Sequence, residues 1–226
     1  MDVNSRRRVR QSRAWLAYSA HRYAVLFYGL LFMLVIWPAA TIVGLPQVGI
    51  KLLLGGCLIA AVLPNATKRT AGFFMAAVIV LIALRMGSDE GIVPVTAAFV
   101  VIMWGVVGLL AAVASLRFAV STPRVDSETV YSALSTYLLA GVFFGQIYAA
   151  LEQIHPGSLT GPDPVSDIIC VYYSFVTLAT LGYGDYLPRS DITRGIATLE
   201  VIGGQLFLAV MVARLIGAFE LPGRKT

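Results

Sequence analysis

The feature that most limits how this chain can fold is a series of long apolar runs separated by short polar segments. The runs cover residues 23–44, 48–63, 71–86, 93–116, 130–151 and 196–219. A helix needs about 20 apolar residues to cross a bilayer. With 58% hydrophobic and only 13% charged residues, the chain would expose too much apolar surface in water. The sequence therefore predicts an all-α membrane protein with six transmembrane helices.

Most of the basic residues lie in segments that face the same side of the membrane if every run crosses once; Arg85, Arg189 and Arg194 fall on the outer side. Five arginines crowd the first thirteen residues, and other basic residues occupy segments 66–70, 116–124 and 222–226. Because Lys and Arg are enriched in cytoplasmic loops, we expect both termini in the cytoplasm, at a cell (inner) membrane. The net charge of +5 thus indicates topology and contact with anionic lipid, and not nucleic-acid binding. Arginine outnumbers lysine 14 to 3, which indicates a bacterial source.

A break in the pattern separates the fifth run from the sixth. The apolar stretch 168–180 has 13 residues, which suits a re-entrant helix better than a crossing one. It leads into TLATLGYGDYLP, residues 177–188. Irregular backbone at membrane depth is tolerated only where protein buries it or where it lines a watery path. Gly182 and Gly184 permit backbone angles that align carbonyl oxygens toward such a path, and Thr180 adds a hydroxyl.

The sequence TLGYGD, between a short aromatic helix and a long one, resembles the selectivity filter of the potassium channel superfamily, whose loops read T-V-G-Y-G. The resemblance covers residues 129–219, and the six runs match the six-helix, one-pore members in number and order. It implies a homotetramer that conducts K⁺ passively, with no catalysed reaction and no cofactor besides the permeant ion. The filter residues would be Thr180, Leu181, Gly182, Tyr183 and Gly184, with K⁺ bound at the first four.

The resemblance also implies roles for residues around the filter. Asp185 would accept a hydrogen bond from Tyr172, and Tyr183 would brace against Tyr173 and Thr177. Leu181 departs from the usual valine or isoleucine and lacks the stiff β-branch, which puts filter rigidity and inactivation in question, more than cation preference.

Three sites on the last run carry open alternatives. Glu200 is either a buried acid that supports the filter or an acid near the outer interface that water solvates. Gly203 and Gly204 are either a gating hinge or a site of close helix packing. Arg214 is a candidate for contact with anionic lipid, or it extends to the inner interface.

The first four runs, residues 23–118, resemble a voltage-sensor unit without its charges. No charged residue lies within 93–116; Arg85 precedes this run and Arg117 follows it. A basic interfacial segment (1–22), a linker (119–128), a pore domain (129–219) and a short tail (220–226) complete the predicted organisation. We expect opening to depend weakly on voltage.

Several alternatives remain at this point. The chain could be a weakly selective cation channel, a regulatory subunit that conducts only beside a partner, or a secondary transporter, although a transporter predicts paired broken helices and only one is found. Cys57 and Cys170 lie in apolar runs and are predicted to pack there. His155 is interpreted as an exposed loop histidine, with a pH sensor as the alternative.

Overall fold

The computed structural model describes residues 21–44, 97–121 and 125–218, with scattered positions between residues 49 and 84. The basic segment up to residue 20, most of the second and third predicted spans, Cys57, Arg85 and the tail lie outside the described residues. The elements in the described ranges are α2 (Arg22–Val43), α5 (Ala97–Ser121), α6 (Ser127–Ile154), β1 (Leu159–Thr160), α7 (Asp167–Leu178), β2 (Leu187–Pro188) and α8 (Asp191–Ala218).

Four of these helices are long and apolar enough to cross a membrane: α2, α6, α8 and the part of α5 within Ile102–Ser121. α7 has 12 residues. At 1.5 Å per residue such a helix is about 18 Å long, whereas the hydrocarbon core is about 30 Å thick. The prediction of a helical, multi-pass membrane protein is therefore confirmed for the described residues. The total of six membrane spans stays a prediction.

A polar cap explains why α6 begins before its apolar run. The Asp126 carboxylate accepts hydrogen bonds from the amide (2.9 Å) and the hydroxyl (2.7 Å) of Thr129. These bonds satisfy helix donors that would otherwise lack a partner, and they lower the pKa of Asp126. As a result α6 starts at Ser127, and α5 runs on to Ser121, so the segment between these helices is shorter than the predicted linker.

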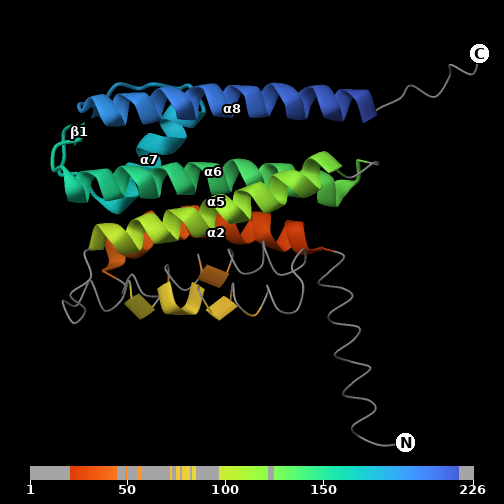
Figure 1. The fold of residues 1–226 in the computed structure, drawn as a ribbon, viewed down its shortest axis with the longest axis horizontal. Helices are drawn as coiled ribbons and strands as arrows, with labels where there is room; N and C mark the ends of the chain where they lie inside the picture. Colours follow the sequence, from red (N-terminus) through yellow and green to blue (C-terminus); the bar gives the residue numbers. More distant parts are fainter. Residues whose placement is uncertain are drawn as a thin grey trace, which may run out of the picture.

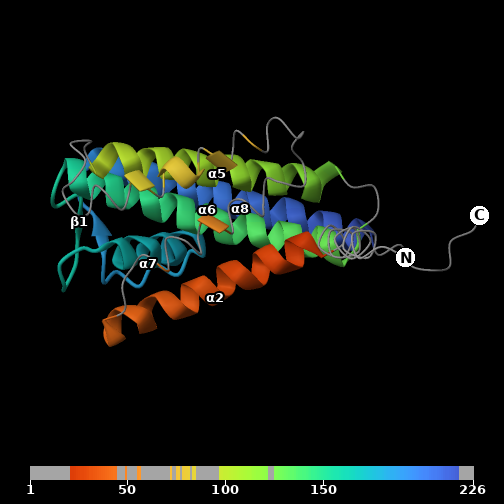
Figure 2. The same ribbon diagram turned by 90° about the horizontal axis from the view of Figure 1, so that it is seen from below.

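α6 is the central helix of the bundle. In Figure 1 it lies between α8 on one side and α5 and α2 on the other, and it contacts all three as well as α7. α2 diverges from the other helices toward one end of the bundle (Figure 2). One face of α2 is buried, with a spacing of three or four residues that keeps it on one side of the helix. Its members are Tyr23, Leu26, Leu30, Met33, Trp37 and Ala40.

α7 lies at the end of the bundle near the strands, between α6 and α8 (Figure 1). Two glycines of α6, four residues apart, leave the space in which α7 packs. A Cβ on Gly141 would lie 2.5 Å from the Phe175 ring, and one on Gly145 would lie 2.7 Å from the Cα of Val171. Small residues at this spacing are typical of close helix packing in membranes. This pair was not predicted from the sequence, although the spacing of the two glycines in GVFFG, residues 141–145, is visible there.

The two strands join the segment before α7 to the segment that follows TLGYGD. They pair antiparallel, with Leu159 opposite Pro188. The amide of Arg189 also donates to the Ser158 carbonyl at 2.8 Å. Both ends of the irregular segment are therefore held, one by α7 and the other by this pair of strands.

Candidate functional site

The loop that follows α7, residues 180–185 and here called the glycine loop, alternates between left-handed and ordinary backbone. Positive φ angles occur at Thr180 (58°), Gly182 (56°) and Gly184 (80°). Thr180 is the one non-glycine residue with a positive φ in the part of the chain that the structure describes. Such alternation allows successive carbonyl oxygens to face the same side.

Hydrogen bonds fasten the start of the glycine loop to the end of α7. The amides of Leu181 and Gly182 both donate to the Val176 carbonyl, at 2.9 and 3.4 Å, and the Thr180 amide donates to the Thr177 carbonyl at 2.9 Å. Among the described residues, none donates a hydrogen bond to the carbonyl oxygens of residues 180–184. The first three amides of the loop are thus bonded to α7, and its carbonyl oxygens remain available to a cation.

Asp185 closes the outer end of the loop. The Tyr172 hydroxyl donates to Asp185 Oδ2 at 2.7 Å, and the Tyr186 amide donates to Oδ1 at 3.0 Å. The bond from Tyr172 is the main reason why the pKa of Asp185 lies below its usual value. The contact implied by the resemblance is therefore present, and it joins the loop to α7 at a second point.

Tyr183 and Leu181 project from the single chain. They are 67% and 56% exposed, respectively. Tyr173 is instead buried, with its ring edge-to-face on Tyr148 at 4.8 Å between centroids. Within this chain the α7 tyrosine packs inward on α6 while the loop tyrosine faces outward, so the expected brace of Tyr183 against Tyr173 and Thr177 stays a prediction.

Glu200 lies behind α7, fully buried. It accepts a hydrogen bond from the Tyr148 hydroxyl of α6 at 2.6 Å and contacts the Ser174 hydroxyl of α7. Of its two alternatives, solvation near the outer interface is excluded by this burial. The sequence could not identify Tyr148 and Ser174 as partners, since both are distant along the chain.

The two glycines of α8 differ in their surroundings. A Cβ on Gly204 would lie 2.7 Å from Leu178 Cδ1 and 3.0 Å from the Leu178 carbonyl, whereas nothing lies within 4 Å of one on Gly203. Close packing therefore accounts for Gly204, and α8 runs as one helix through both. Arg214 is half-buried near the C-terminal end of α8.

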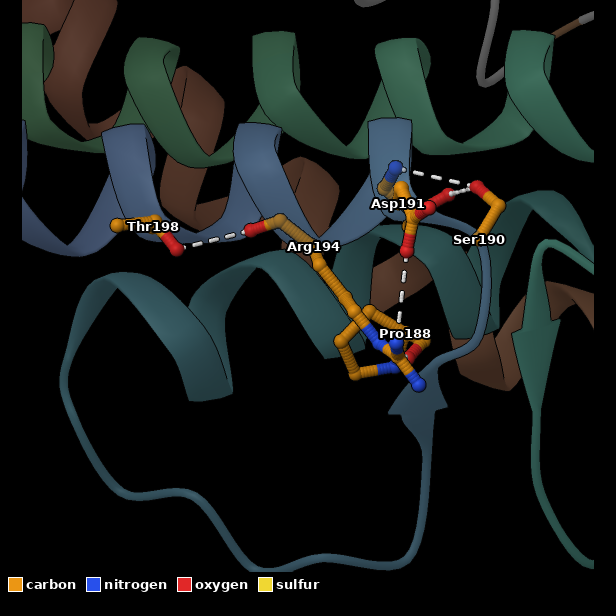
Figure 3. A network of polar contacts seen from close by, with 6 residues as sticks. Pro188, Ser190, Asp191, Arg194 and Thr198 are labelled. Carbon is orange, nitrogen blue, oxygen red and sulfur yellow. Dashed lines mark hydrogen bonds and ion pairs between the residues drawn. The ribbon is translucent and has the colours of Figure 1, made fainter.

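Polar contacts at the start of α8 hold the residues that connect the glycine loop to this helix (Figure 3). Ser190 caps the helix by accepting from the Thr193 amide at 3.1 Å. Arg194 Nε donates to the Pro188 carbonyl at 3.3 Å, and its guanidinium lies 3.5 Å from Asp191. The apolar pattern alone placed Arg194 in an outer loop. It lies in the first turn of α8 because the serine cap starts the helix before the apolar run.

The remaining candidates have simple surroundings. Cys170 is buried among the side chains of Tyr148, Tyr173 and Tyr186, which confirms its packing role. His155 is exposed at the end of α6. No group of three or more His, Cys, Asp or Glu side chains that could hold a metal ion is found in the described ranges.

Comparison with known proteins places this site in a family. Residues 133–220, which include α7, the glycine loop and α8, match the family model described as an ion channel. The chain is 31% identical over 90 residues to the inward rectifier potassium channel Kirbac3.1 of Paramagnetospirillum magnetotacticum. This part of the chain belongs to the potassium channel superfamily.

Two further relatives agree with this membership. The chain is 32% identical over 82 residues to two pore potassium channel a of Oryza sativa subsp. japonica, and 29% identical over 87 residues to the voltage-gated potassium channel regulatory subunit KCNF1 of Rattus norvegicus. The matches cover 36% to 38% of this chain but only 28%, 22% and 17% of the three relatives, in the order given. No solved structure matches the chain significantly.

Proposed function

We propose that this chain forms a homotetrameric channel that conducts K⁺ selectively and passively. Four glycine loops would meet on one axis, and the carbonyl oxygens of Thr180, Leu181, Gly182 and Tyr183 would replace the water around K⁺. α7 would be the pore helix, with its C-terminal end directed at the ion path, where the helix dipole favours a cation. Both termini would be cytoplasmic, and Arg214 would contact anionic lipid.

The observation that carries this proposal is the backbone of the glycine loop. Its positive φ angles alternate, its first amides are bonded back to α7, and its carbonyl oxygens accept no hydrogen bond from the described residues. A loop built in this way offers a row of oxygens to a cation.

The tetramer is supported by what a single chain leaves uncovered. One loop offers one oxygen at each level, whereas a dehydrated ion needs a ring. α8 also exposes several large apolar side chains, and neighbouring copies would cover those near the axis. They include Leu199, Ile202, Leu206 and Val210.

Reconstitution in bilayers tests the proposal. With K⁺ on one side and Na⁺ on the other, we expect a reversal potential close to that of K⁺, and mass measurement in lipid should give four copies. A reversal potential near zero would establish the weakly selective cation channel instead. A conducting monomer or dimer would contradict the tetramer.

A regulatory subunit is the second candidate, because one relative carries that description in its name. Such a subunit would form no conducting homotetramer and would copurify with another channel chain. Selective K⁺ currents from the purified single chain would exclude this candidate.

A further inference from the structure

Three helices meet at one buried carboxyl group behind the glycine loop. Glu200 of α8 contacts Tyr148 of α6 and Ser174 of α7, and the Ser174 hydroxyl also lies 2.7 Å from the carbonyl oxygen of Gly141 in α6. Glu200, Ser174 and Tyr148 are each 0% exposed. Because these side chains have no solvent-exposed surface, the hydrogen bonds that they make with one another decide how their polar atoms are satisfied.

The number of hydrogens available to this chain of oxygens determines the state of the carboxyl. Three close contacts run from Tyr148 to Glu200, from Glu200 to Ser174 and from Ser174 to the Gly141 carbonyl. Each contact needs one hydrogen between its two oxygens. The tyrosine and serine hydroxyls supply one hydrogen each, and the carbonyl supplies none. The third hydrogen must therefore be on the carboxyl group.

The charges around Glu200 support the same state. The titratable groups that face it are Tyr148 and Tyr137 from α6 and Tyr173 from α7, none of which carries a positive charge. In the part of the chain that the structure describes, no cationic side chain forms an ion pair with Glu200. A buried carboxylate without a cation is strongly disfavoured, whereas a neutral acid with hydrogen-bonded neighbours is not.

We propose that Glu200 is a neutral carboxylic acid that positions α7 against α6 and α8, and that its ionisation at alkaline pH weakens the support of the glycine loop. As an acid, Glu200 donates to Ser174 and accepts from Tyr148. Ser174 is then free to donate to the Gly141 carbonyl, so the three helices share one unbroken chain of hydrogen bonds. The protonation state stands on this geometry alone, and only its effect on current rests on the proposed function.

Infrared difference spectroscopy tests the protonation state without any assay of transport. The parent protein at neutral pH should show the carbonyl stretch of a protonated carboxylic acid, and Glu200→Gln should lack it. Titration to alkaline pH should remove the band from the parent. If parent and Glu200→Gln spectra are the same in this region at neutral pH, the proposal is overturned.

The positioning role is tested by thermal unfolding and K⁺ current across pH. The side-chain amide of the Glu200→Gln variant can donate to Ser174 and accept from Tyr148. This variant should therefore match the parent at neutral pH and resist alkaline loss of both stability and current. Glu200→Ala should be destabilised at every pH. Equal alkaline sensitivity of the parent and Glu200→Gln would overturn the positioning role.

The two proposals fail separately. If the purified parent conducts no K⁺ but shows the Glu200 band and a stability difference that grows with pH, the proposed function fails and the neutral acid stands. If it conducts K⁺ selectively and lacks the band, the neutral acid fails and the proposed function stands.

Discussion

α5 and α7 both pack along α6, but their contacts differ in closeness and in chemistry. Where α5 meets α6, Cβ atoms added at Gly105 and Gly108 would lie 3.6 and 3.9 Å from the side chain of Phe143. An apolar pocket of about 290 Å³ remains between these helices, lined in part by Phe143 and Ile147. Where α7 meets α6, Cβ atoms at Gly141 and Gly145 would lie only 2.5 and 2.7 Å from the nearest atoms.

Hydrogen bonds are also more numerous around α7. In the described residues α5 is bonded to α6 through the Ser132 hydroxyl, which donates to the Ser115 carbonyl at 2.7 Å. α7 is bonded to α6 through Ser174, to α8 through Glu200 and to the glycine loop through Val176 and Tyr172. A long apolar interface tolerates small shifts, because nonpolar contacts have little directionality. A helix held by several directional hydrogen bonds cannot shift without breaking them. The family match covers most of α6, with α7 and α8, and stops short of α5, so it coincides with the closely held interface.

The largest effect is expected from the glycine loop, where Gly182→Ala and Gly184→Ala should abolish selective K⁺ current. Both positions have positive φ, where a Cβ costs roughly 1–2 kcal/mol in each chain. Vesicle flux of K⁺ and Na⁺ measures the loss. Gly157→Ala is the matched control, because Gly157 also has a positive φ (85°) and a Cβ there meets nothing within 4 Å, and it should conduct like the parent. Unchanged selectivity in both loop variants would contradict the assigned ion path.

Gly145→Ala should be the next largest change, since its Cβ would collide with the backbone of Val171, which cannot rotate away. We expect a loss of roughly 1–3 kcal/mol in unfolding free energy, as for overpacked cores. Gly108→Ala makes the same change at the α5–α6 interface, where space exists, and should be neutral or stabilising by up to about 1 kcal/mol. Thermal and denaturant unfolding in detergent measures both. Equal destabilisation of the two variants would remove the distinction between the interfaces.

Tyr172→Phe and Asp185→Asn should each alter open-state lifetime or inactivation a few-fold, with little change in selectivity, because they remove one bond at the loop's outer end. Combining the two changes should add little to either alone.

The same bond predicts how the loop responds to pH. Because the bond lowers the pKa of Asp185, its stabilisation of the folded loop is fully present above the free-acid pKa of about 3.9. That stabilisation is lost as the pH falls through the lower pKa of the folded state. Lowering the outer pH toward about 3.9, but not below it, should therefore leave this bond intact, and single-channel recordings should show an unchanged open-state lifetime.

The smallest effect is expected in the N-terminal half. Arg117 is the one charged residue within α5 and is exposed near its end. Neutralising it with Arg117→Gln should leave the conductance–voltage curve unchanged, and the apparent gating charge should be well below the roughly three to four charges per subunit of a working sensor. A steep curve that this change weakens would give α5 a sensing role.

The sequence predicted the helices whose apolar runs are long, and it predicted the glycine loop, because both depend on local composition. It failed where partners come from distant segments. The contact of Tyr173 with Tyr148 on another helix was not predicted. Glu200 was recognised as unusual, yet its partners became visible only when α6, α7 and α8 were placed together. Helix starts were missed at Asp126 and Ser190, because caps lie outside the apolar pattern.

The segment that β1 introduces has a consequence for how this gene can change over generations. A Cβ on Gly161 would lie 2.2 Å from the ring of Tyr186, so the backbone there is pressed flat against the aromatic side chain. A larger residue at position 161 would require the Tyr186 ring to move, although the segment looks like an ordinary surface turn. Substitutions at positions 161 and 186 should therefore appear together in related sequences. The exposed turn at His155 should tolerate substitution independently.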